Sequence, residues 1–169
     1  VTPEKCDLSA VGNFTRSYDC FVIENTTVGS TQMLYSGFRT RDAQKRTLTA
    51  LEDVSALSFK IYKVGSPTGD ITFAIRKVSD DSTIASVVYG DASTLTTSGA
   101  WYKKDFSSLV NVVAGDYYIS VEYSGGDSSN YVKVETSSTD VTAGDVYYYD
   151  GTWHIWTDHD LGFKIHYGE

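Results

Sequence analysis

Apolar and polar residues alternate along much of the chain, most clearly in residues 161–167 near its end. The same period of two recurs in residues 57–61, 71–75 and 117–123. Strict alternation places every second side chain in a core and the others in water, which is the pattern of a half-buried β-strand. The chain is therefore predicted to consist mainly of strands.

Turn residues divide the alternating segments into strands of similar length. Clusters of Gly, Asp, Ser and Asn occupy residues 65–70, 80–82, 90–91 and 125–130. The polar segment 39–46 is expected to be a loop or a short helical turn. The predicted strands are 21–23, 31–38, 48–64, 71–78, 84–89, 101–106, 115–123, 131–136, 145–149, 152–156 and 161–167.

This regular spacing predicts an all-β fold, a jelly-roll-like β-sandwich of about 9–11 mostly antiparallel strands. We expect residues 21–169 to form one domain, because a β-sandwich of this length usually has a single core. Residues 1–20 are expected to form an N-terminal arm that contains a disulfide loop.

The dipeptide Asp150-Gly151 predicts a hairpin with a two-residue type I′ turn, since both positions need positive φ. That turn would pair Tyr148 with Trp153 and Tyr147 with His154. It would also place four ring-bearing side chains on one outward face. Such a face would be a subunit interface or a platform for a glycan, unless a loop or a second sheet covers the rings. These candidates are Tyr147, Tyr149, His154 and Trp156.

Charge narrows the classes of partner. The 169 residues carry a formal net charge of −8, which disfavours contact with the phosphate backbone of nucleic acid. An acidic surface suits divalent cations or neutral polymers, although solubility alone would also explain it. No apolar run approaches the roughly 20 residues needed to cross a bilayer.

The two cysteines, Cys6 and Cys20, are expected to form a disulfide, although two free thiols in a reducing compartment are the alternative. The bridge would close a loop of about 15 residues, worth roughly 3 kcal/mol. Asn13 and Asn25 begin Asn-x-Thr sequons, which are glycosylated only in exported proteins. We therefore expect an extracellular, secreted protein, here in its mature form without a signal peptide.

Several aspartates stand in or beside predicted loops, where Ca²⁺ usually finds oxygen ligands. Each alone is more often a turn residue, and none follows the spacing of an EF-hand. The pair before the last strand, Asp158 and Asp160, is the preferred candidate. The full set of candidate ligands is Asp80, Asp81, Asp127, Asp145, Asp158 and Asp160.

Catalytic patterns are weak. The chain has no Gly-x-Ser-x-Gly motif and no His-x-x-x-His pair, so neither a serine hydrolase nor a zinc site is favoured. Carboxylates for glycoside hydrolysis could come from any acidic sandwich. We expect a protein that is not an enzyme.

Residues 58–65, 72–76, 114–119 and 160–165 resemble a broad jelly-roll family of secreted, surface and fibre proteins. Within that family, the acidic chain with its cysteine-bearing arm is similar to the cannula subunits of hyperthermophilic archaea. That resemblance implies extracellular tubes or filaments of identical subunits, joined by donor-strand exchange with Ca²⁺ at the contacts. The Ser- and Thr-rich composition departs from the usual hyperthermophile pattern.

Three functions therefore compete. The first is a structural subunit that assembles with copies of itself, with residues 1–8 or the surroundings of residues 21–24 as the donor strand. The second is a carbohydrate-binding module of a secreted protein. The third is a surface or phage attachment domain, for which a discrete oligomer is expected.

Overall fold

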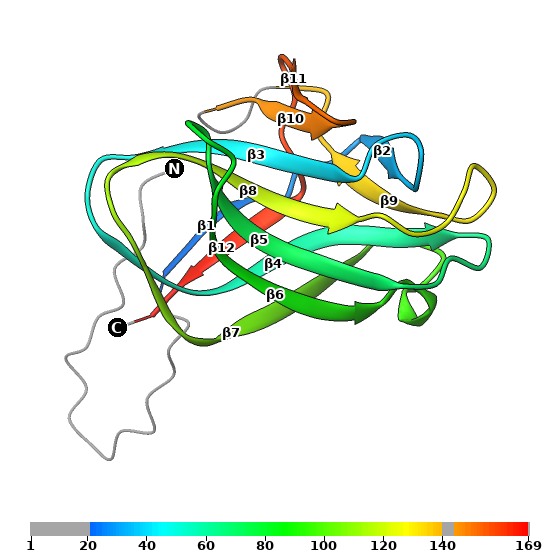
Figure 1. The fold of residues 1–169 in the computed structure, drawn as a ribbon, viewed down its shortest axis with the longest axis horizontal. Helices are drawn as coiled ribbons and strands as arrows, with labels where there is room; N and C mark the ends of the chain where they lie inside the picture. The colour runs from blue at the N-terminus through cyan, green and yellow to red at the C-terminus, as the bar shows by residue number, and fades with distance from the viewer. Residues whose placement is uncertain (1–20, 140–143, 169) are drawn as a thin grey trace.

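Two antiparallel β-sheets pack face to face in the computed structural model, which describes residues 21–139 and 144–168 (Figure 1). One sheet holds β1 (Phe21–Asn25), β2 (Ser30–Leu34), β4 (Glu52–Val64), β7 (Ala100–Val112), β9 (Tyr131–Thr136) and β12 (Phe163–Tyr167). The other holds β3 (Arg41–Leu48), β5 (Asp70–Lys77), β6 (Thr83–Asp91), β8 (Gly115–Tyr123), β10 (Val146–Tyr149) and β11 (Trp153–Trp156). The predicted all-β sandwich is confirmed, with twelve strands in the described residues and a short 3₁₀ helix, η1 (Ala92–Thr94). No helix in that part of the chain could span a bilayer.

The first sheet is organised around β4, whose 13 residues are long enough to take two partners in succession along one side. β12 pairs with residues 54–59 of β4, and β9 pairs with residues 61–64. β7 pairs along the opposite side of β4. β1 and β2 continue the sheet by pairing with β12 and β9, respectively, so β7 is an outer strand.

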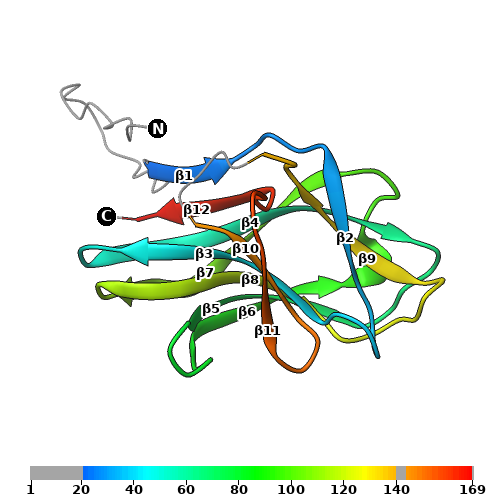
Figure 2. The same ribbon diagram turned by 90° about the horizontal axis from the view of Figure 1, so that it is seen from above.

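The second sheet runs in the order β11-β10-β3-β8-β5-β6, which makes β6 an outer strand as well. β6 and β7 lie next to each other on the same side of the sandwich, one at the border of each sheet (Figures 1 and 2). The β10–β11 hairpin stands at the other border of the second sheet.

The alternation seen in the sequence fills the space between the sheets. Leu57, Phe59 and Ile61 point inward from β4 and are fully buried. Phe73 on β5 meets Phe59 across the core, with 4.8 Å between the ring centroids. Each large side chain removed from water contributes about 1.5–3 kcal/mol, so this core is the main source of stability.

Residues 39–46 were expected to be a loop or helical turn, and this expectation was wrong. Most of them belong to β3, which pairs with β8 on one side and β10 on the other. The inward positions of this strand are the polar residues Asp42 and Gln44, both fully buried. Polar residues at core positions hide the period of two on which the prediction depended.

The register predicted for the β10–β11 hairpin was also wrong. Tyr149 pairs with Trp153 and Tyr148 with His154, so the loop has three residues, 150–152, instead of two. Gly151 takes φ of +125°, and the Asp150 N–H donates to the Thr152 carbonyl across 3.3 Å. Because directly opposed residues share a face, a shift of one residue exchanges the faces of β11.

Candidate functional sites: an open groove and a two-faced hairpin

A groove of about 480 Å³ runs between the outer strands β6 and β7. Residues 84–87 form one wall and residues 106–111 form the other. Several of these side chains pack against the core but remain partly exposed, among them Val87 and Phe106, and Leu109 is 39% exposed. The apolar interior therefore reaches the surface along this side of the sandwich.

A wide bulge in β7 forms one wall of the groove. Ala56 of β4 pairs with Asp105 and Val54 pairs with Val110, so Ser55 alone stands opposite residues 106–109. Neither outer strand has a second partner strand among the described residues. Both strands therefore present backbone N–H and C=O groups on the side of the groove, where another strand could accept and donate hydrogen bonds.

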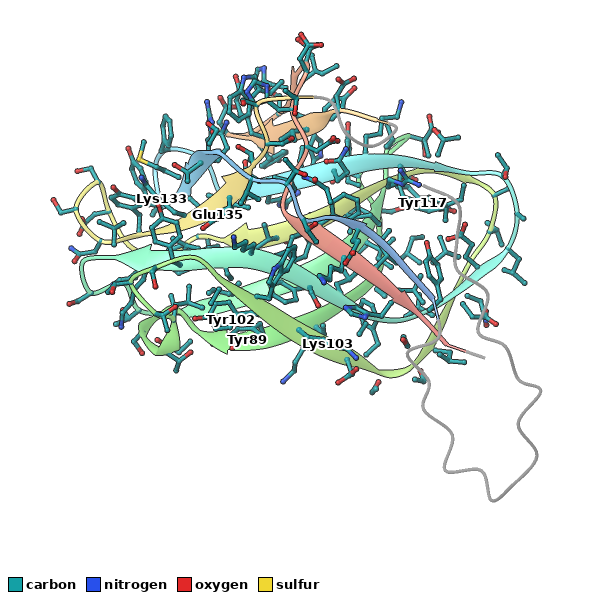
Figure 3. All side chains as sticks on the ribbon, turned by 180° about the vertical axis from the view of Figure 1, so that it is seen from behind. Tyr89, Tyr102, Lys103, Tyr117, Lys133 and Glu135 are labelled. Atoms are coloured by element: carbon teal, nitrogen blue, oxygen red, sulfur yellow. The ribbon has the colours of Figure 1, made fainter. Side chains whose placement is uncertain are left out.

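Two partly buried tyrosines, Tyr89 of β6 and Tyr102 of β7, pack against the core between these strands and do not line the groove. The ring of Tyr89 lies 5.3 Å from that of Tyr102 (Figure 3). It also lies 5.5 Å from the ring of Phe73. The Thr96 N–H donates to the Tyr102 hydroxyl across 2.8 Å. Burial raises the pKa of Tyr89, so its hydroxyl stays neutral at physiological pH.

A second arrangement of polar groups covers the outer face of the second sheet. Arg76 holds Glu122 with both prongs of its guanidinium, through Nε at 2.6 Å and Nη2 at 3.1 Å. Arg41 donates to Asp81 across 2.8 Å and lies 3.7 Å from Glu122. We call Arg41, Arg76, Asp81 and Glu122 the paired cluster, because each of its cations contacts a carboxylate.

Aromatic rings of the hairpin cover the paired cluster. Trp153 donates its indole N–H to Asp81 across 2.9 Å and stacks on Tyr118 at 4.2 Å. Tyr149 packs against Trp153 at 5.2 Å, and Tyr147 against Tyr118 at 5.1 Å. Burial raises the pKa of Tyr118 to about 12. These rings use their faces on one another, which makes this surface a poor platform for a sugar ring.

The other face of the hairpin carries a column of stacked groups that we call the Arg39 stack. The Arg39 guanidinium lies 3.8 Å from the ring centroid of Tyr148 and 5.1 Å from that of Phe38. Tyr148 stacks in turn on His154 at 5.0 Å, and His154 contacts the Asp150 carboxylate at 2.9 Å. Within the described residues, Arg39 forms no ion pair with a carboxylate.

A buried carboxylate, that of Asp42, lies on the same face as Tyr148 of the Arg39 stack, because the two residues pair directly. Asp42 is fully buried opposite Val121 and Tyr148, and neither of its side-chain oxygens has a hydrogen-bond partner in the described part of the chain. Burial raises the pKa of Asp42 to about 7, and the positive charge of Arg39 opposes that shift.

The four ring-bearing residues predicted to share one face are divided between the two faces. Tyr147 and Tyr149 lie with Trp153 over the paired cluster, whereas His154 belongs to the Arg39 stack. Trp156 shares the side of His154 and stacks on His159 at 3.6 Å. The one-residue shift in the register is the cause.

The six candidate calcium ligands do not converge. The described residues contain no group of three or more His, Cys, Asp or Glu side chains that could hold a metal ion. Asp80 and Asp127 accept hydrogen bonds within their own turns, which lowers the pKa of each. Asp81 belongs to the paired cluster, and the main-chain carbonyl of Asp145 accepts from the Lys45 N–H.

The preferred calcium pair is not brought together in one accessible loop. Asp160 is fully buried and accepts from the Gln44 amide across 2.7 Å, whereas Asp158 is exposed with φ of +60°. Gln44 also donates to the Gly144 carbonyl, so it ties β3 to the chain before β10. Asp160 is a structural carboxylate on the inner side of the second sheet.

Most of the predicted covalent sites, Cys6, Cys20 and Asn13, lie outside the described residues. Asn25 is described and is only 2% exposed. Its side-chain nitrogen, to which a glycan would be attached, donates to the carbonyls of Thr27 and Leu161 at 3.0 and 2.8 Å. The folded chain therefore does not offer this nitrogen for modification.

One polar pair was not predicted from the sequence. Ser58 and His166 are both buried on the outer side of the first sheet, with 2.7 Å between the Ser58 hydroxyl and the His166 Nε2. They are 108 residues apart, so only the pairing of β4 with β12 brings them together. Sequence signals from a lone serine and a lone histidine could not have found this contact.

Comparison with known proteins adds no identification: no protein-family model matches the chain, and no curated protein sequence matches it. The resemblance to cannula subunits stays a prediction.

Proposed function

We propose that this chain is a non-enzymatic structural subunit that assembles outside the cell with copies of itself, by adding a strand at the groove between β6 and β7. The observation that carries the proposal is the pair of outer strands that lie side by side over partly exposed core residues. Such an edge is a liability in a monomer, because it invites pairing with another chain.

Adding a strand would give the outer strands hydrogen-bond partners and would also cover the exposed apolar side chains of the groove. An extended segment would form main-chain hydrogen bonds with β6 or β7, and its alternate side chains would cover apolar residues such as Val87 and Leu109. Head-to-tail repetition of one such contact generates rings or open filaments.

The donor is the N-terminal arm of a neighbouring copy, in its residues 1–8. The alternative donor, residues 21–24, is already used in the same chain, because β1 pairs with β12 along its whole length. Removing β1 from that ladder would leave β12 as an outer strand without its partner.

The resemblance also implies calcium at the contacts. The described carboxylates do not form a site for it, so we assign no step of assembly to a cation. Calcium dependence rests only on the net charge of −8, since repulsion between acidic copies weakens when counterions are present.

The test is light scattering and electron microscopy of the full chain, with and without calcium, over a range of concentrations. Val87→Arg places a charge in the groove and should abolish assembly, and so should deletion of residues 1–8. Val88→Arg is the matched control, because Val88 is 49% exposed and lies outside the groove.

Thermal unfolding confirms that each variant is folded before assembly is compared. A native chain that stays monomeric under all of these conditions would contradict the proposal. A discrete oligomer of fixed size would favour the attachment domain instead, and equal loss of assembly in both valine variants would exclude the groove.

A further inference from the structure

The Arg39 stack has a property that strand addition does not use. Of the four arginines in the described part of the chain, Arg41 and Arg76 bind carboxylates, and Arg46 also has a partner. The Arg39 guanidinium contacts the rings of Phe38 and Tyr148 and forms no ion pair among the described residues, and its positive charge acts on the buried Asp42 carboxylate. In a chain with 22 acidic residues, Arg39 nevertheless donates no hydrogen bond to a carboxylate of the described residues.

We propose that the Arg39 stack is a binding site for a carboxylate-bearing sugar, such as a uronic acid residue of an acidic polysaccharide. Contacts with the two rings restrict the guanidinium, and no carboxylate among the described residues accepts a hydrogen bond from its N–H donors. A carboxylate accepts two parallel hydrogen bonds from this fork, which is the geometry that favours arginine over lysine. The fork is ordered before the ligand arrives, so binding loses little conformational entropy.

The surroundings of Arg39 fit the rest of a sugar ring. Tyr35 stacks on Phe38 at 5.1 Å and lies 6.2 Å from Tyr131, which extends the aromatic surface beyond the arginine. Tyrosine supplies both apolar ring carbons for the C–H groups of a pyranose and a hydroxyl for its hydroxyl groups. At the other end of the stack, His154 is exposed and is oriented by Asp150 and Thr152.

These features favour a sugar acid over an acidic peptide. A glutamate side chain could satisfy the guanidinium, but it would leave the flanking tyrosines without a partner for their rings. The groove that suits an extended peptide lies at the opposite border of the second sheet, between β6 and β7. The two sites are separate, so this inference does not depend on the proposed function.

The experiment is isothermal titration calorimetry of the full chain with an oligomer of galacturonic acid. The same oligomer with its carboxylates methyl-esterified is the matched neutral ligand, and a peptide of glutamates tests the other class of partner. Binding of the acid form, with at least about tenfold weaker binding of the ester, is expected from loss of a charge-assisted bidentate contact.

Arg39→Gln and Arg39→Lys should each weaken binding of the acid oligomer by about tenfold, since lysine keeps the charge but loses the fork. Lys77→Gln removes the same charge at a cation on β5 and should leave the affinity unchanged. Absence of binding, equal binding of the ester, or an unaffected Arg39→Gln variant would overturn the proposal. If the glutamate peptide bound more tightly than the acid oligomer, the proposal of a sugar ligand would be wrong and an acidic protein partner would be favoured.

Discussion

The β10–β11 hairpin has an arginine on each of its two faces, and the surroundings of the two arginines differ. Arg41 stacks on Tyr149 at 4.3 Å and also holds Asp81 and Glu122. Arg39 stacks on Tyr148 at 3.8 Å and holds no carboxylate among the described residues. Each arginine therefore contacts a tyrosine of β10, and only Arg41 is also ion-paired among the described residues.

The two arginines differ in whether a carboxylate of the protein binds them, and this difference distinguishes a structural cluster from a candidate binding site. In the paired cluster, every cation and carboxylate is satisfied within the protein, and the cluster joins β3, β5, β8 and the hairpin. The Arg39 stack ends in donors that no carboxylate of the described chain accepts. A cluster whose groups satisfy one another stabilises the fold, whereas a fixed but unsatisfied group is available for a ligand.

The largest effect that we expect concerns Asp42, which lies on the face of the Arg39 stack. Its pKa is 3.8 in the unfolded chain and about 7 in the folded one, so the folded state binds the proton more tightly. The stabilisation is complete below pH 3.8 and is lost as the pH rises through 7. The free energy of unfolding should therefore increase by roughly 2–3 kcal/mol as the pH falls from 8 to 5, measured by urea denaturation.

Asp42→Asn removes this titration and is expected to flatten the profile between pH 5 and 8. The aspartates with a lowered pKa, such as Asp80 and Asp116, lose their contribution only as the pH falls below about 4, outside this window. A native profile that does not change between pH 5 and 8 would show that Asp42 is ionised in a solvated site.

Glu122→Gln is the next strongest perturbation, because it leaves Arg76 without its bidentate partner. Both side chains are about 15% exposed, so solvent screens part of the loss, and we expect a decrease of about 2 kcal/mol in the free energy of unfolding. Urea denaturation followed by far-UV circular dichroism measures it. If Glu122→Gln lowered the free energy of unfolding by less than Arg39→Gln does, the Arg39 stack and not the paired cluster would be the structural face of the hairpin.

Trp153→Phe keeps a ring on Tyr118 but removes the indole N–H that Asp81 accepts. We expect the free energy of unfolding to fall by about 1 kcal/mol more than in Trp156→Phe, a matched change on the other side of the hairpin. Denaturation curves for the two variants are compared under the same conditions. Equal losses would mean that the indole hydrogen bond contributes nothing.

Arg39→Gln should have the smallest effect on stability. The contacts with Phe38 and Tyr148 are lost together with the positive charge that acts on Asp42, and a partly exposed cation–π contact is worth about 0.5 kcal/mol. The melting temperature should stay within a few degrees of the native value. A loss as large as that of Glu122→Gln would make Arg39 a structural residue and count against the sugar site.

The sequence predicted the sandwich because its core strands carry a clear period of two. Leu57, Phe59 and Ile61 were identified as an inward row, and all three are buried. The prediction of β3 failed because its inward positions, Asp42 and Gln44, are polar. The hairpin was identified at the correct place, but a turn of three residues was taken for one of two.

The candidate sites were less predictable than the fold. The rings of the hairpin were singled out, but the arginines beneath and beside them were not, because Arg39 and Arg41 stood in an apparent loop. The groove has no sequence signature, since residues 106–109 bulge only when paired against Ser55. The predicted calcium ligands are dispersed, because aspartates in loops accept hydrogen bonds from N–H groups of their own turns and do not converge on one site.

The amino-acid order settled the positions of most strands, since the period of two depends only on neighbouring residues, but it did not give the full length of β7, which was predicted as 101–106 and spans residues 100–112. Tertiary structure decided the register of the hairpin and which of the two arginines contacts carboxylates. It also decided that β6 and β7 are the outer strands that border the groove. These depend on contacts between residues far apart in the chain, such as Arg41 with Asp81 and Arg76 with Glu122. Local pattern encodes the burial of each side chain, whereas pairing across the sheets determines which charges are satisfied.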